Sequence, residues 1–115
     1  MTPDAQRIAI AEACGWSKNN EYPVGLDGSR PWANPLYESC WLVYDDWNLP
    51  DFLNDLNAMH EAEKRLTEQQ EFHYHDELHK LCNKGKRHAC YESIRATAAQ
   101  RAEAFLRTLK LWIND

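Results

Sequence analysis

The side chains best suited to binding a metal lie between positions 73 and 90. They are His73, His75, His79, Cys82, His88 and Cys90. On a helix, His75, His79 and Cys82 stand at i, i+4 and i+7 and share one face. His88 or Cys90, returning on a strand, would then complete a tetrahedral zinc site. The chain has no CxxC pair and no HExxH motif, and histidines on a polar helix are usually only solvated. We therefore predict no metal or other cofactor, and keep His75, His79, Cys82 and Cys90 as candidate ligands.

Acid and base catalysis has its own set of candidates, Asp45, Asp46, Asp51, Asp55, His60 and Glu61. Asp45 and Asp46 are adjacent and on a strand would face opposite ways. Asp51 and Asp55 fall at the start of an expected helix, where acids stabilise the helix dipole. A lone histidine such as His60 is more often structural than catalytic. Because GxSxG, P-loop and GxGxxG motifs are also absent from the sequence, we predict that the protein is not an enzyme.

The segment from 16 to 47 is rich in aromatic residues. It holds Trp16, Tyr22, Trp32, Tyr37, Trp41, Tyr44 and Trp47, interleaved with Asn19, Asn20, Arg30 and Asn34. Aromatic rings stack on nucleobases or anchor protein interfaces, and arginine pairs with phosphate through two hydrogen bonds. The same rings could instead form the core of a stretch with few helices. We predict ligand binding by Trp16, Arg30, Trp32, Trp41 and Tyr44, and the alternative stays open.

A second polar group lies where an expected strand leads into the last helix. Its members are Arg95, Thr97, Gln100 and Arg101. A helix N-terminus presents free backbone N–H groups to an anion, so this group is a candidate phosphate cradle. Alternatively, Thr97 and Gln100 only cap the helix and Arg101 pairs with an acid. Asn54 and Asn57 add amide groups on a preceding helix, where a ligand could use them.

Helix-start signals and strand propensities predict the elements that position these groups. Helices are expected over 3–14 and 51–66, and two more begin at the capping-box sequences after Thr67 and Thr97. Strands are expected over 39–44 and 89–94. We predict an α+β fold in which a small antiparallel sheet of two or three strands is layered with about four helices. A single domain should span residues 1–115.

Composition limits the classes of function. The chain has 115 residues, 43% of them hydrophobic, which suits one core. A net charge of −5 argues against general nucleic-acid binding. We find no secretion signal and no apolar run of about 20 residues, and the four widely spaced cysteines suit a reducing compartment. The expected location is the cytoplasm, away from membranes.

Three stretches of sequence resemble a known family. They are Ala11-Glu12-Ala13-Cys14-Gly15-Trp16, residues 49–63 beginning Leu49-Pro50-Asp51-Phe52, and residues 95–109 beginning Arg95-Ala96-Thr97-Ala98. Together they look like the small phage proteins of the phage ABA sandwich domain family. The resemblance implies a phage or prophage gene acting in the host cell cytoplasm and a sheet layered between helices. It implies no known reaction.

Three functions from different classes follow as hypotheses. The first is a phage counter-defence protein, a homo-oligomer that binds and sequesters a host immune signalling nucleotide, a cyclic nucleotide sponge, without catalysis. The second is a phage inhibitor that binds a host defence protein directly through an aromatic and acidic surface. The third is a small zinc-binding or nucleotide-acting protein built on the histidine cluster. We favour the first from sequence alone.

Overall fold

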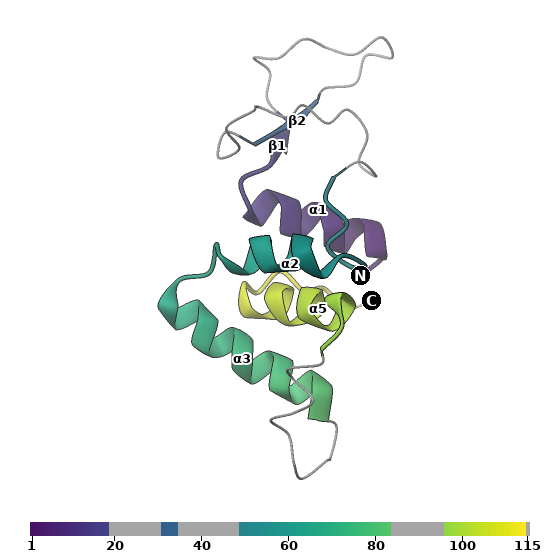
Figure 1. Ribbon diagram of the computed structural model, residues 1–115. Coiled ribbons are helices and arrows are strands. Elements are labelled where there is room, and N and C mark those ends of the chain that lie inside the picture. The colour runs from purple at the N-terminus through teal and green to yellow at the C-terminus, as the bar shows by residue number, and fades with distance from the viewer. Residues whose placement is uncertain (19–30, 35–48, 84–95, 115) are drawn as a thin grey trace.

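The computed structural model of the chain describes residues 1–18, 31–34, 49–83 and 96–114, and within them four helices and a two-stranded antiparallel sheet (Figure 1). The first helix, α1 (Pro3–Ala13), begins as its sequence predicts. The Thr2 Oγ1 accepts a hydrogen bond from the Ala5 N–H at 3.1 Å, and proline occupies the first turn. The chain leaves the helix through Gly15, whose φ of 100° is strained for any residue with a Cβ.

Two further helices start with the predicted capping boxes. Helix α3 (Glu68–Asn83) follows Thr67, and helix α5 (Ala98–Thr108) follows Thr97. The Gln70 N–H donates to Thr67 Oγ1 at 3.2 Å, while Gln70 Oε1 accepts from the Thr67 N–H at 2.9 Å. Thr97 and Gln100 repeat the arrangement at 3.1 and 2.9 Å. Both helix starts are confirmed.

The remaining helix, α2 (Leu56–Glu63), is shorter than predicted at both ends. Asp51 was expected in its first turn, but residues 52–54 form a turn in which the Asp51 carbonyl accepts from the Asp55 N–H at 2.8 Å. The N-cap is Asp55, whose carboxylate accepts from the Asn57 N–H at 2.9 Å. The sequence offers two residue patterns that can start a helix, Pro50-Asp51 and Asp55. The helix starts at the second, and Phe52, which precedes that start, is buried in the core.

The sheet pairs β1 (Ser17–Lys18) with β2 (Trp32–Ala33) in antiparallel register, Ser17 opposite Ala33 and Lys18 opposite Trp32. In Figure 1 it lies beyond α1, at the end of the molecule away from α3. The α+β class is confirmed. The strands predicted over 39–44 and 89–94 lie outside the described residues.

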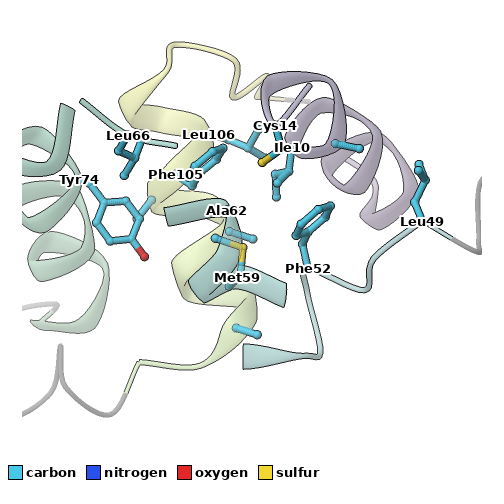
Figure 2. Close-up of a cluster of buried hydrophobic side chains, with 14 of the residues drawn as sticks. Ile10, Cys14, Leu49, Phe52, Met59, Ala62, Leu66, Tyr74, Phe105 and Leu106 are labelled. Atoms are coloured by element: carbon cyan, nitrogen blue, oxygen red, sulfur yellow. The ribbon is translucent and has the colours of Figure 1, made fainter. Parts of the chain in front are cut away.

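Helix α5 is central to the packing. It contacts α1, α2 and α3, and its side chains Ala102, Ala104, Phe105 and Leu106 are fully buried. Alanine at two of these positions lets neighbouring helices approach closely. Figure 2 shows the resulting core, to which α1 contributes Ile10, α2 contributes Met59 and α3 contributes Tyr74. The core residues of all four helices form one hydrophobic cluster.

Among the described residues, no helix combines the length and apolar character that crossing a membrane requires.

Candidate functional site

Helix α3 packs one side against the core and leaves the other bare. Tyr74 and Leu78 are buried on its inner side. Phe72, two residues before Tyr74 and so about 200° around the helix from it, is 83% exposed. The exposed residues near Phe72 on this side define what we call the Phe72 face. They are Glu68, Phe72, His75, Asp76 and His79.

Two open hollows flank the exposed ring. One, of about 470 Å³, is lined by Glu68, Gln69, Phe72 and His73. The other, of about 320 Å³, is lined by Phe72, His75, Asp76 and His79. The aromatic ring therefore stands between two shallow, open depressions whose other lining residues are polar or charged.

Helix α3 carries a strong excess of negative charge. It has four acids, Glu68, Glu71, Asp76 and Glu77, against one base, Lys80, for a net charge of −3 with its histidines neutral. The Lys80 Nζ lies 3.0 Å from an Asp76 oxygen and 3.9 Å from a Glu77 oxygen, so the lysine is already paired. Glu68 and Glu71 sit in the first turn, where they also stabilise the helix dipole. Helix α3 as a whole is therefore negative.

The predicted metal ligands are brought together only in part. His75 and His79 are exposed and line the same hollow, whereas Cys82 is half-buried and packs against the core. His73 is exposed too, but it lines the other hollow. Cys90 and His88 lie outside the described residues. Within the described ranges, no group of three or more histidine, cysteine or acidic side chains is arranged to hold a metal ion.

The three described groups of the predicted phosphate cradle have protein partners. Thr97 and Gln100 satisfy each other across the first turn of α5. The Arg101 Nη1 donates to Glu63 Oε1 at 3.2 Å, and its Nε donates to the Ala96 carbonyl at 3.3 Å. This is the alternative in which the helix is capped and the arginine pairs with an acid. Arg95 lies outside the described residues, and phosphate binding here stays a prediction.

Glu63 joins three helices. Its Oε1 also accepts from the Tyr74 hydroxyl at 2.9 Å, and its Oε2 lies 3.5 Å from the His60 Nδ1. Burial, and then the charge and hydrogen bond of Glu63, raise the pKa of Tyr74. With α2 supplying the carboxylate, α3 the phenol and α5 the guanidinium, this cluster holds the three helices together.

Two of the predicted stacking aromatics are core residues. Trp16 and Trp32 are 5% and 6% exposed and belong to the hydrophobic cluster, so neither ring has a face available for a base. Arg30, Trp41 and Tyr44 lie outside the described residues. Trp16 also lines a small, partly open cavity of about 10 Å³ beside Cys14 and Asn34, the size of one water molecule.

The predicted amide and acid–base groups serve local structure or face solvent. The Asn54 Nδ2 donates to both Asp51 carboxylate oxygens at 3.2 Å. Asn57 is exposed, and only its backbone N–H meets the Asp55 cap. Asp45 and Asp46 lie outside the described residues.

Burial raises the pKa of the Cys14 thiol to about 11, which keeps it protonated and unreactive at neutral pH.

The residue that sequence reasoning missed is Phe72. The signal was present, because Tyr74, Leu78 and Leu81 follow one another at helical spacing and Phe72 falls off that stripe.

Comparisons with protein-family models, with curated proteins and with solved structures each find no match. The resemblance to the phage ABA sandwich domain family stays a prediction.

Proposed function

We propose that this protein binds a partner protein through the Phe72 face and catalyses no reaction. The observation that carries the proposal is the 83% exposure of Phe72 on a well-formed helix. Burying a phenylalanine side chain is worth roughly 1.5–3 kcal/mol, which this fold forgoes and a partner would recover. Large aromatic side chains that fill a pocket are typical anchors of protein interfaces.

The negative charge of α3 indicates which kind of partner surface would bind. Glu68 and Asp76 lie on the Phe72 face, and Glu71 is nearby. A negative surface attracts a basic one and repels phosphate groups. The partner that fits is a protein with an apolar pocket surrounded by lysine or arginine. Because the sequence resembles a phage family, we propose that this partner is a defence protein of the host, which the bound chain inhibits.

Two matched substitutions test the proposal. Phe72→Ser removes the anchor, and Leu56→Ser removes another exposed apolar side chain, 44% exposed, from α2. We expect Phe72→Ser to abolish capture of a host protein that the unaltered chain binds, and Leu56→Ser to leave capture unchanged. Capture should also weaken as salt is raised, because the attraction is partly between charges. A host protein captured equally by both variants would overturn the assignment to the Phe72 face.

Sequestration of a signalling nucleotide by a homo-oligomer is the second candidate. The aromatic density of the 16–47 segment favours it. With Trp16 and Trp32 buried, this function would depend on Arg30, Trp41, Tyr44 and Arg95. We rank it second because the helix that carries the exposed Phe72 has a net charge of −3 with its histidines neutral, which disfavours a phosphate-bearing ligand.

A further inference from the structure

The histidines of the Phe72 face form a pair with the spacing of a chelate. His75 and His79 are four residues apart on α3, one turn of a helix, so their side chains project from the same side. Both are exposed, and both line the hollow of about 320 Å³ beside Phe72. Two imidazoles placed in this way on one helical turn are the arrangement with which helices present paired nitrogen ligands to zinc.

We propose that His75 and His79 together bind one divalent transition-metal ion from solution. Imidazole nitrogen suits copper, nickel and zinc, and Cu²⁺ should be held more tightly than Ni²⁺ or Zn²⁺ at such a site. The protein supplies two ligands, and water fills the other positions of the ion. The ion is therefore exchangeable, unlike the four-ligand structural zinc considered from sequence.

The neighbouring side chains do not extend the set. Asp76 lines the same hollow, but its carboxylate is held by Lys80 at 3.0 Å. Cys82 packs against the core. Within the described ranges no third histidine, cysteine or acidic side chain joins the pair. The negative charge of α3 nonetheless makes the binding of a cation stronger than it would be at the same histidine pair on a neutral helix.

Bound metal should stabilise α3, because one ion can contact both His75 and His79 only when the turns that carry them are helical. A ligand that binds the folded chain alone raises the midpoint of thermal unfolding. This inference does not rest on the partner-protein proposal, since it needs only the free chain.

The test is a titration of the untagged protein with Cu²⁺ and with Ni²⁺. Calorimetry measures the affinity and the number of ions bound, and thermal unfolding measures the shift of the midpoint. We expect one ion per chain and a rise of the midpoint with metal. His75→Ala and His79→Ala should each weaken binding about a hundredfold, because the remaining imidazole loses its chelating partner. His73→Ala is the matched control: His73 is exposed on the same helix but lies about 160° from His75, and its removal should leave the affinity unchanged.

Spectroscopy gives an independent readout. The electron paramagnetic resonance spectrum of bound Cu²⁺ should show coupling to nitrogen that is reduced in His75→Ala and in His79→Ala. The proposal is overturned if the unaltered chain binds no metal, if either single variant binds as tightly as the unaltered chain, or if His73→Ala weakens binding as much as they do.

Discussion

At the scale of single residues, Glu63 is a polar side chain that bonds to two other helices. It accepts from Tyr74 at 2.9 Å and from Arg101 at 3.2 Å, and both donors are at least partly withdrawn from water. A hydrogen bond to a charged group is worth roughly 1.5–3 kcal/mol, and removing the acceptor leaves its donors unsatisfied. Glu63 therefore connects α2 to both α3 and α5.

Replacing Glu63 with alanine should lower the free energy of unfolding by about 2–3 kcal/mol, because Tyr74 and Arg101 lose a shared acceptor. Urea denaturation followed by circular dichroism measures the loss. Glu61→Ala is the control, since Glu61 lies two residues away on the same helix and makes an exposed pair with Lys64 at 2.8 Å. Equal losses in the two variants would show that the shared acceptor contributes nothing.

Tyr74 should make the protein less stable at alkaline pH. Its pKa is raised in the folded chain, first by burial and then by the charge and hydrogen bond of Glu63, whereas an unfolded tyrosine titrates near pH 10. Above about pH 10 the unfolded chain has released a proton that the folded chain retains. The free energy of unfolding therefore falls as pH rises, by up to about 1.4 kcal/mol per pH unit.

The variant Tyr74→Phe removes this contribution. Its free energy of unfolding should be lower than that of the unaltered chain at neutral pH, because the bond to Glu63 is lost, and should decline less steeply between about pH 10 and 11. Urea titrations across that range measure both slopes. Parallel curves would mean that Tyr74 ionises alike in the folded and unfolded chain.

Which residues are exposed could be predicted from sequence only in part. The aromatic-rich sequence predicts Trp16 and Trp32 as stacking residues, with a core role as the alternative, and both are in the core. An aromatic residue in a segment of irregular composition has no periodicity that tells the two roles apart. Phe72, by contrast, lies on a long helix whose periodicity places it opposite Tyr74 and Leu78.

At the scale of elements, capping chemistry was the most informative signal. The starts of α1, α3 and α5 agree with the predicted ones, because the caps at Thr2, Thr67 and Thr97 form between residues no more than four positions apart. The start of α2 was placed too early. Asp51 and Asp55 are both suited by residue type to begin a helix, so the local sequence does not distinguish them. Tertiary packing decides which of the two does so.

Thr97→Ala should lower the free energy of unfolding by about 1 kcal/mol, because it deletes the acceptor of the Gln100 N–H at the start of the central helix. Thr97→Ser keeps a hydroxyl in place and should stay close to the unaltered chain. Chemical denaturation of the two variants side by side measures the difference. Alanine and serine variants of equal stability would mean that the cap is dispensable to α5.

At the scale of the whole molecule, the described hydrophobic core includes no residue from the outer side of α3. Helix α5 lies at the centre, α1 and α2 pack on it with the inner side of α3, and one hydrophobic cluster runs through all four (Figures 1 and 2). No residue of the Phe72 face belongs to this cluster, and the contact from the face to it that the structure describes is the His75 ring, which meets the Tyr74 ring edge-on at 5.8 Å. Substitution of Phe72 should therefore leave folding intact. That separation makes the proposed binding surface testable apart from stability.

The most direct test of the proposed function is native mass spectrometry of the protein recovered from host cells. The partner-protein proposal predicts a mass equal to the chain plus a host polypeptide, lost in Phe72→Ser and retained in Leu56→Ser. A mass increment matching an intact cyclic nucleotide, present equally on the unaltered chain and on Phe72→Ser, would contradict that proposal and establish sequestration instead.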